Sequence, residues 1–256
     1  MNPDGGPSEL GEPITTLRSV LIRHADPDRD AARCAELYAP FVRDTVVSLE
    51  EEPPDADEFA QRIKRISRTH PWLVAEMDGE LPGFAYATLH RERAAYRWAT
   101  DVTVYVDPAY HRRGIARALY TALFDLLVRQ GFYVACAGIT LPNEASVGLH
   151  ESLGFAPVGI YQRIGFKFGR WWDVGWWQLE LNLAGEDPPA RPRPPAQLQS
   201  PGSVEPGPRA HLEDGRKRPL LSKPPSFDTD RAASWRGRPF KIPTPRSPRV
   251  SQQTPG

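Results

Sequence analysis

The sequence predicts an α/β fold in which a mixed, mostly antiparallel central sheet carries helices on both faces. Its patterns run as one strand, two helices, three strands, and then helix, strand, helix and two strands, an order typical of such a sheet. The central part, a strand at 99–106, a helix at 114–130 and a strand at 132–139, predicts a right-handed crossover between parallel strands. A length of 256 residues leaves room for one sizeable core or two small ones.

Composition divides the chain into three parts. Residues 1–13 are rich in glycine, proline and acidic residues, lack the apolar core of a signal peptide, and are expected to be disordered. Residues 14–183 carry the patterns of a folded domain. Residues 184–256 contain 16 of the 28 prolines and 13 Lys or Arg against 7 Asp or Glu, so a disordered, mildly basic tail is expected. Its proline-rich segments could bind a partner as a polyproline helix or form a passive extension.

Charge and apolar content argue against two classes of function. The net charge is zero, and because the tail carries a positive excess, the first 183 residues are net acidic and unsuited to wrapping nucleic acid. No apolar run is long enough to span a membrane. Cys34 and Cys136 lie in apolar patterns, which indicates buried free thiols in a reducing compartment. We therefore expect a cytoplasmic protein.

The first elements follow from hydrophobic periodicity. Apolar and polar residues alternate over 17–22, which predicts a strand. Apolar residues then recur at helical spacing over 27–43 and over 55–66. Asp55 begins the second of these helices with a capping pattern. Each helix is therefore expected to bury one face.

Three strands are expected next. Two short apolar runs, 72–77 and 83–89, flank Asp78–Gly79, a dipeptide typical of a hairpin turn. The segment 99–106 is rich in valine and threonine, which favours a third strand. The hairpin and the third strand are expected to lie in the same sheet.

The second half of the chain alternates between helices and strands. The clearest helix spans 114–130, because four leucines share one face and a glycine follows its last turn. A strand of the buried type at 132–139 and a short helix at 143–153 come next. The last two strands are expected at 158–164 and 174–183.

A glycine turn connects the strand at 99–106 to the helix that follows. In His111-Arg112-Arg113-Gly114-Ile115-Ala116, Gly114 allows close approach of the backbone to a ligand, and Arg117 adds a charge in the first helical turn. Free N–H groups at a helix start, the helix dipole and nearby guanidinium groups suit a pyrophosphate. An ordinary loop with solvated arginines is the alternative, but the strand before the turn and the helix after it favour the phosphate site. The spacing matches neither a Walker motif nor a dinucleotide fingerprint.

Several short segments together form a known pattern. They are Val104-Tyr105-Val106, His111–Ala116, Leu141-Pro142-Asn143 with Ser146, and His150–Phe155. Further segments are Pro71–Glu76, Ala95-Tyr96 with Trp98, Thr103–Val106, Gly165–Lys167, and Trp171 followed by Asp173–Gly175 and Trp177-Gln178. The first set resembles the GCN5-related N-acetyltransferase (GNAT) superfamily, and the second resembles its phosphinothricin N-acetyltransferases. The resemblance covers roughly residues 14–183 and implies the acyl-CoA N-acyltransferase fold.

The resemblance implies how acetyl-CoA binds as a co-substrate. The backbone of Val104, Tyr105 and Val106 is expected to pair with the pantetheine arm as an added strand would. Asn143 is expected to contact the cofactor and to cap its own helix. His111 stands where the family usually carries glutamine or arginine, a departure from the pattern. The pyrophosphate is expected on Arg112, Arg113, Gly114, Ile115, Ala116 and Arg117.

Two residues are candidates for moving protons during acetyl transfer. The acceptor ammonium must lose a proton before it attacks the thioester, and a proton donor helps the thiolate to leave. By the resemblance, Asp101 stands where the family has a glutamate that is thought to deprotonate the amine directly or through water. Asp101 is one methylene shorter, and a solvated carboxylate is the alternative interpretation. His150 matches a histidine beside the sulfur of coenzyme A in the phosphinothricin group, the alternative being a core histidine.

The acceptor is expected to meet Arg91, Arg93 and Tyr96, which match pocket positions of the family. Guanidinium groups suit this role because they bind a carboxylate or phosphinate through two parallel hydrogen bonds. An exposed Arg-Glu-Arg turn is the alternative. The three glutamates at 50–52 depart from the family and either repel an anionic acceptor or are solvated.

The remaining histidines and tryptophans carry two further expectations. No spacing predicts a metal site, and the loop or surface histidines are His24, His70, His90 and His211. Four tryptophans between 171 and 177 are dense for so short a stretch. Because family members dimerise through their late strands, the resemblance implies a homodimer, and packing in the core is the alternative for some of the four.

The sequence thus predicts an enzyme that uses a carboxylate base to transfer an acetyl group directly from acetyl-CoA to a primary amine. The expected acceptor is small and amino-acid-like, of the phosphinothricin, methionine sulfone or methionine sulfoximine type, which would link the enzyme to antibiotic resistance. One alternative is acetylation of another amine, such as a protein N-terminus or an antibiotic. Another is a non-catalytic coenzyme A-binding module whose tail recruits partners.

Overall fold

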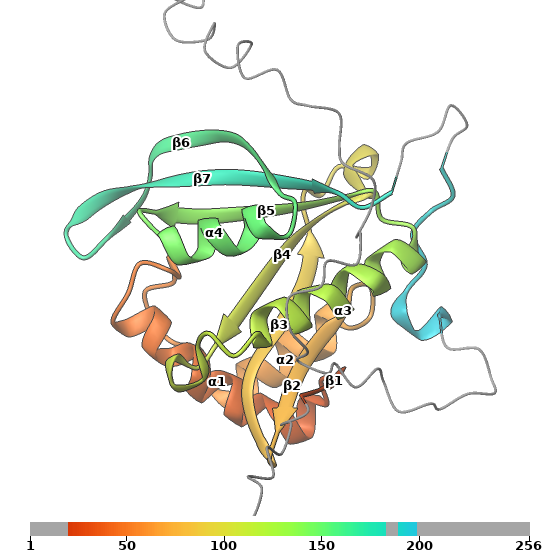
Figure 1. Ribbon diagram of the computed structural model, residues 1–256, viewed down its shortest axis with the longest axis horizontal. Helices are drawn as coiled ribbons and strands as arrows, with labels where there is room; N and C mark the ends of the chain where they lie inside the picture. The colour runs from red at the N-terminus through yellow and green to blue at the C-terminus, as the bar shows by residue number, and fades with distance from the viewer. Residues whose placement is uncertain (1–19, 183–188, 199–256) are drawn as a thin grey trace, which may run out of the picture. The chain divides into compact units, whose positions relative to one another are not determined.

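The computed structural model describes residues 20–182 and 189–198 of the chain. In these ranges seven strands form one sheet in the order β1-β2-β3-β4-β5-β7-β6 (Figure 1). Neighbouring strands are antiparallel except β4 and β5, which are parallel. The strands are β1 (Leu21–His24), β2 (Trp72–Met77), β3 (Glu80–Leu89), β4 (Ala99–Val106), β5 (Val134–Leu141), β6 (Ala156–Lys167) and β7 (Arg170–Glu180).

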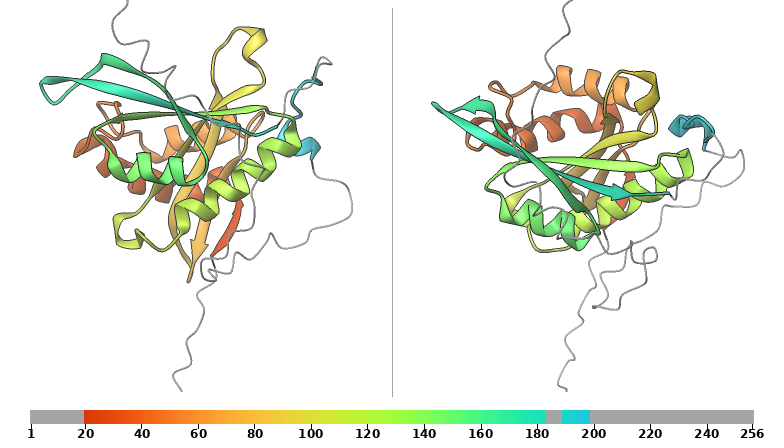
Figure 2. Two further views of the ribbon diagram at one scale, coloured as in Figure 1. Left: turned by 45° about the horizontal axis from the view of Figure 1, so that its top comes forward. Right: turned by 90° about the horizontal axis from the view of Figure 1, so that it is seen from above.

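Helices cover both faces of this sheet, which confirms the predicted fold class (Figure 2). One face carries α1 (Pro27–Arg43) and α2 (Ala56–Ile66), and the other carries α3 (Ile115–Gln130) and α4 (Glu144–Ser152). Short 3-10 turns are η1 (Ala94–Tyr96), η2 (Pro108–Tyr110) and η3 (Pro195–Gln197). None of the helices in the described ranges is long and apolar enough to cross a membrane.

The central strands are apolar on both faces because a separate core lies on each side. Along β2, Leu73 and Ala75 join the core under α3, whereas Trp72 and Val74 join the core under α1 and α2. Successive side chains of a strand point to opposite faces, so a run of apolar residues rather than an alternation marks such a strand.

Local sequence explains where the helices begin and end. The Asp26 side chain caps α1 by accepting hydrogen bonds from Asp28 N and Arg29 N. Asn143 caps α4 by accepting from Ser146 N. Gly131 ends α3 with φ of 94°, a left-handed conformation that favours glycine. The helices predicted at 27–43, 55–66, 114–130 and 143–153 are confirmed to within one residue at each end.

The strand predictions are confirmed in kind but differ in extent. β3 begins at Glu80, directly after the two-residue turn, so the hairpin is tighter than the predicted start at 83. β6 and β7 form a hairpin longer than predicted at 158–164 and 174–183. Nearly every β6 side chain is exposed, so its sequence lacks the alternation that would mark its ends.

β4 and β5 separate part-way along their length, which opens the sheet (Figure 1). They pair only from Ala99 to Asp101, opposite Val134 to Cys136. Beyond this point β5 stays paired with β7 up to Leu141. The backbone of 102–106 therefore has a free edge on the β5 side.

The described segment 189–198 lies inside the predicted tail yet is held to the end of α3. Gln130 donates through its amide to Arg193 O at 2.6 Å, and Arg193 N donates to Gln130 O at 2.8 Å. Trp98 Nε1 donates to Ala190 O at 2.9 Å. These bonds to backbone groups do not depend on apolar content, so composition predicts disorder where the structure has a bound segment. The predictions for residues 1–13, for the start of the first strand at 17–19, for the rest of the tail at 184–188 and 199–256, and for His211 lie outside the described residues.

Candidate active site

A narrow slot lies where β4 and β5 separate. Its cavity of about 100 Å³ is lined by Val102–Tyr105 of β4 and Ala137–Thr140 of β5. Tyr120 of α3 and His150 of α4 close it on one side. The slot is thus an elongated space beside an unpaired strand edge, a shape suited to a thin, extended ligand that can hydrogen-bond like a strand.

The glycine turn lies at the open end of this slot. Gly114 is the N-cap of α3 with φ of 77°, and no side chain caps the helix. The first backbone bond of α3 at this end runs from Ala118 N to Gly114 O, so the N–H groups of the first turn are available to a ligand. The Ile115 side chain is buried in the core, and this residue can serve an anion only through its backbone. This geometry supports the predicted phosphate site.

The arginines of the turn differ in how they are held. Arg113 stacks over the Tyr110 ring at 5.0 Å, and Arg117 donates to Ser152 Oγ at 2.7 Å. Arg112 is exposed and has a positive φ of 59°. His111, the departure from the family pattern, has Nε2 at 3.0 Å from Val106 O and so ties the turn to β4.

Asp101 lies at the closed end of the slot, where β4 last pairs with β5. Its Oδ1 is 2.6 Å from Nδ1 of His90, the residue directly after β3. The two side chains are 27% and 16% exposed, respectively. Burial raises the pKa of Asp101 above its ordinary value, and the hydrogen bond from His90 opposes this rise. His90 lies in the loop after β3, as predicted, but it is partly buried and bonded to Asp101 rather than solvated.

His150 lies on the α3 and α4 face of the slot and is fully engaged. Its Nδ1 is 2.8 Å from Ser146 O, and its Nε2 is 3.1 Å from the Tyr120 hydroxyl. A carbonyl only accepts, so Nδ1 donates and Nε2 accepts from Tyr120. Burial lowers the pKa of His150, which favours the neutral ring. Tyr120 was not predicted, because its place on the apolar stripe of α3 indicates core packing.

Two of the three predicted acceptor residues, Arg91 and Tyr96, lie beside His90 or its neighbour Trp176, whereas the third, Arg93, is linked to them in the described part of the chain only by its bond to Tyr96 N. The Arg91 guanidinium lies 5.7 Å from the Trp176 ring, and the Tyr96 ring lies 6.1 Å from the His90 ring. Arg93 is exposed and accepts from Tyr96 N through its carbonyl. Trp176 Nε1 is buried without a hydrogen-bond partner in the described residues, so this wall also offers a donor to a ligand.

The acidic stretch at 50–52 is less repulsive than its sequence suggests. Glu50 receives two hydrogen bonds from Arg62, at 2.8 and 3.0 Å, and one from the Tyr38 hydroxyl at 3.0 Å. Burial raises the pKa of Glu50, but these partners outweigh it and the pKa lies below its ordinary value. Glu51 and Glu52 are exposed to solvent. The wall thus carries a paired carboxylate and two solvated ones.

A thiol completes the cluster at the closed end. The ligating atoms of His90, Asp101 and Cys136 all lie within 4.8 Å of one another. Burial raises the pKa of Cys136 to about 11, so its thiol stays protonated, and His90 and Asp101 already bond to each other. We assign no metal to this cluster, and the sequence-based expectation of a metal-free site stays a prediction.

The comparison with known families decides what kind of protein has this site. A family model described as an acetyltransferase (GNAT) domain matches residues 22–176. The chain belongs to the GNAT acetyltransferase family. This confirms the expected enzyme class, an acetyl-CoA-dependent N-acetyltransferase.

The acetyltransferase aligns with almost the whole length of each of three relatives. A phosphinothricin N-acetyltransferase of Streptomyces viridochromogenes is 38% identical over 175 residues, 68% of this chain and 95% of that protein. An L-methionine sulfoximine/L-methionine sulfone acetyltransferase of Salmonella typhimurium is 36% identical over 164 residues, 64% of this chain and 95% of that protein. A GNAT superfamily phosphinothricin acetyltransferase from Sinorhizobium meliloti, solved with acetyl-CoA, is 32% identical with a TM-score of 0.65, covering 71% and 99% of the two chains.

Two features of the slot region suit two parts of acetyl-CoA. The uncapped start of α3 suits a pyrophosphate, and the free edge of β4 suits the amides of the pantetheine arm. Val104 and Val106 pack on the α3 side, whereas the Tyr105 ring packs against Tyr38 and Phe41, so Tyr105 can pair only through its backbone. A pantetheine arm that starts from a pyrophosphate on the glycine turn and follows this free edge would run toward Asp101.

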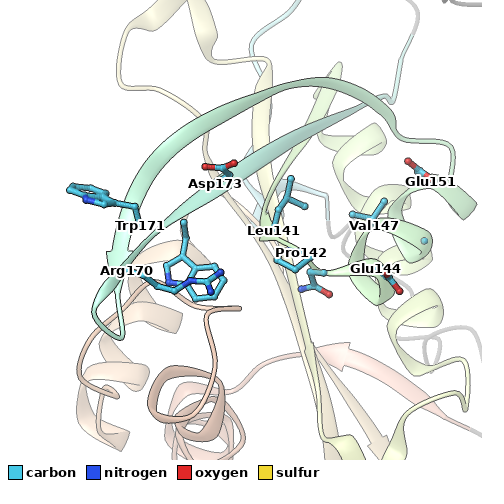
Figure 3. Close-up of a pocket in the computed structure, with 11 residues that line it drawn as sticks. Leu141, Pro142, Glu144, Val147, Glu151, Arg170, Trp171 and Asp173 are labelled. Carbon is cyan, nitrogen blue, oxygen red and sulfur yellow. The ribbon is translucent and has the colours of Figure 1, made fainter.

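A larger hollow of about 700 Å³ lies away from this chemistry in the acetyltransferase. Figure 3 shows Leu141, Pro142 and Val147 facing Arg170 and Asp173 across it. It shares only Asn143 with the slot, and no residue of the unpaired β4 edge lines it. The hollow instead adjoins the β6–β7 hairpin, so we place the chemistry in the slot.

Proposed function

We propose that this acetyltransferase acetylates the primary amine of a small amino-acid-like acceptor, of the phosphinothricin, methionine sulfone or methionine sulfoximine type. The observation that carries the proposal is the pair of Asp101 and His90 at the closed end of the slot, flanked by Arg91 and Trp176. A base for the amine and a cation for the acceptor's anionic group thus lie on one wall. The acceptors named for the two relatives, phosphinothricin and methionine sulfoximine or sulfone, belong to the same class.

Two groups of this chain would handle the protons of the reaction. Acetyl-CoA supplies an acetyl thioester, so the amine nitrogen forms a bond to the carbonyl carbon while the carbon–sulfur bond breaks. Asp101, directly or through the group it holds, accepts the proton that the ammonium loses. On the other face of the slot, the Tyr120 hydroxyl breaks its hydrogen bond to His150 Nε2 and donates its proton to the departing thiolate instead. Tyr120→Phe should lower kcat in a thiol-release assay while the KM for acetyl-CoA stays near that of the wild type.

The acceptor class is tested by release of free coenzyme A. Purified full-length chain with acetyl-CoA is expected to release thiol when phosphinothricin, methionine sulfone or methionine sulfoximine is added, and to release little without an acceptor. A protein that binds acetyl-CoA but releases no thiol with any of the three would refute the proposal. Thiol release only with an N-terminal peptide or an aminoglycoside would instead assign a different acceptor amine. An active enzyme is expected to protect a phosphinothricin-sensitive host that expresses it.

We also propose that the enzyme is a homodimer formed through the β6–β7 hairpin. β6 is an edge strand, and the large apolar side chains there are more than half exposed, an unusual feature for a free edge. The four tryptophans divide accordingly: Trp177 is in the core and Trp176 is half-buried at the site, whereas Trp171 is 58% exposed and Trp172 stacks under Arg170. A second copy would cover this surface and the adjoining hollow. Light scattering should give twice the mass of one chain, and a monomer would contradict the proposal.

We propose a cytoplasmic location for the enzyme. Both cysteines are free and buried, as a reducing compartment would allow, and none of the described helices could cross a membrane. Cell fractionation is expected to recover the protein with cytoplasmic enzymes, and recovery in the membrane fraction would contradict this.

A further inference from the structure

His90 and Asp101 form a pair that the sequence does not reveal. His90 follows β3 directly, Asp101 lies on β4, and the antiparallel pairing of these strands brings the two side chains together. The Oδ1–Nδ1 distance of 2.6 Å is short, as expected for a hydrogen bond to a charged acceptor. Both side chains are largely shielded from solvent. The pair therefore lies directly beside the last paired residues of β3 and β4, Leu89 and Thr100.

The orientation of this hydrogen bond leaves one ring nitrogen of His90 free. An ionised carboxylate can only accept, so Nδ1 of His90 carries the hydrogen and donates to Asp101. Nε2 then carries the lone pair, and the described residues give it no hydrogen-bond partner. The rings of Tyr96 and Trp176 lie against the imidazole at interplanar angles of 63° and 81°, which restricts rotation of the ring.

His90 and Asp101 lie next to the slot, so the lone pair on His90 Nε2 is close to where the thioester is expected. Asp101 directly precedes Val102, the first β4 residue that lines the slot, and it lies opposite Cys136 in the last β4–β5 pair. The pair therefore lies at the end to which the thioester is directed. Trp176, which packs against His90, also closes over Gly138, a slot residue whose added Cβ would lie 3.3 Å from the indole.

We propose that His90 is the catalytic base of the acetyl transfer and that Asp101 orients it, so that the two act as a dyad. The inference rests on the proposed acceptor reaction and names the atom that takes the proton. Nε2 of His90 accepts one proton from the acceptor ammonium, and the freed amine attacks the acetyl carbon. The imidazolium that forms is stabilised by the Asp101 carboxylate, and it returns its proton to solvent after product leaves.

The chemistry of the two groups favours this division of roles. Asp101 is one methylene shorter than the glutamate that the family resemblance implies, and its Oδ1 is already occupied by His90. Histidine side chains in general titrate nearer to neutral pH than carboxylates do, which suits a general base. A carboxylate behind an imidazole fixes the tautomer, as in hydrolase triads. We therefore place the His90 ring between the shorter Asp101 carboxylate and the acceptor ammonium.

Other charged and titratable groups face the dyad from the neighbouring elements. Arg91 stacks on Trp176 beside it, and Tyr96 of η1 packs on the imidazole ring. Cys136 of β5 contributes a thiol whose pKa burial raises to about 11. Asp101 is the carboxylate that hydrogen-bonds directly to the His90 ring, whereas Arg91 lies against Trp176.

A double-mutant cycle separates a dyad from two independent residues. The kcat/KM for the acceptor is measured against pH for the full-length wild type, His90→Gln, Asp101→Asn and the double variant, with EDTA present throughout. We expect each single change to lower kcat/KM by about 100-fold or more. The kcat/KM of the double variant should lie within about threefold of that of the less active single variant. The limb of the pH profile that reports the base should be lost in His90→Gln. His24→Gln, on the far edge strand β1, is the matched control and should keep wild-type kinetics.

Two results would overturn the dyad. One is a His90→Gln enzyme that retains kcat/KM within about threefold of the wild type, and the other is losses that multiply in the double variant. A third readout is independent of turnover: two-bond ¹H–¹⁵N correlation spectra of the wild type should place the His90 proton on Nδ1, and a proton on Nε2 would also refute the proposal. If the wild type releases no thiol with any acceptor, the acceptor proposal fails, and the tautomer measurement still judges the dyad.

Discussion

Replacing Asp101 by asparagine is expected to lower kcat/KM for the acceptor by about 10²- to 10⁴-fold, the range associated with loss of general-base catalysis. Asparagine keeps the size of the side chain but loses its charge. Its amide can turn an NH₂ toward Nδ1 of His90, which would force the imidazole proton onto Nε2 and block its lone pair. The loss should appear mainly in kcat, because the co-substrate contacts lie elsewhere along the slot and on the glycine turn.

Two other variants serve as controls for Asp101→Asn. Asp125→Asn removes a carboxylate from an exposed position of α3 and should stay within a factor of about two of the wild type. Asp101→Glu restores the longer acid of the family pattern, and we expect it to retain more activity than Asp101→Asn. Asp101 has no part in proton removal, either as the base or as the partner of His90, if Asp101→Asn keeps kcat/KM within about threefold of the wild type while its circular dichroism is unchanged.

Acid is expected to destabilise the fold through His70. This histidine is 6% exposed, its ring packs against Phe132, and its Nε2 is buried without a partner in the described residues. Burial lowers the pKa of His70 to about 4 from an ordinary value of 6.5. Between these two values the unfolded chain binds a proton that the folded chain does not, so stability falls as the pH falls. The loss should reach about 3 kcal/mol of unfolding free energy by pH 4 and be absent above pH 7.

Urea unfolding at a series of pH values tests this linkage. The unfolding free energy of His70→Gln should fall by about 3 kcal/mol less than that of the wild type between pH 7 and pH 4. Parallel pH curves for wild type and His70→Gln would show that His70 titrates alike in both states, contrary to this expectation. The comparison between variants removes the contributions that other acids and histidines share.

Much of the fold could be predicted from the sequence because its elements are specified by neighbouring residues. The Asp26 and Asn143 caps, the glycine that ends α3 and the apolar stripe of that helix each act over a few residues. The edge hairpin of β6 and β7 was underestimated, since its exposed side chains do not report a buried face. The glycine turn was found for the same reason as the helices: one glycine and the helix start define its geometry.

The sequence by itself therefore determined the α/β fold, the turn suited to pyrophosphate and the family, all of which depend on short segments. Only the tertiary structure decided which side chains meet: His90 with Asp101 across β3 and β4, Tyr120 with His150 across two helices, and His70 with the core. Strand register, helix packing and burial set these contacts. Each joins residues on different segments of the chain, and the local pattern of one segment does not show which side chains of another it will meet.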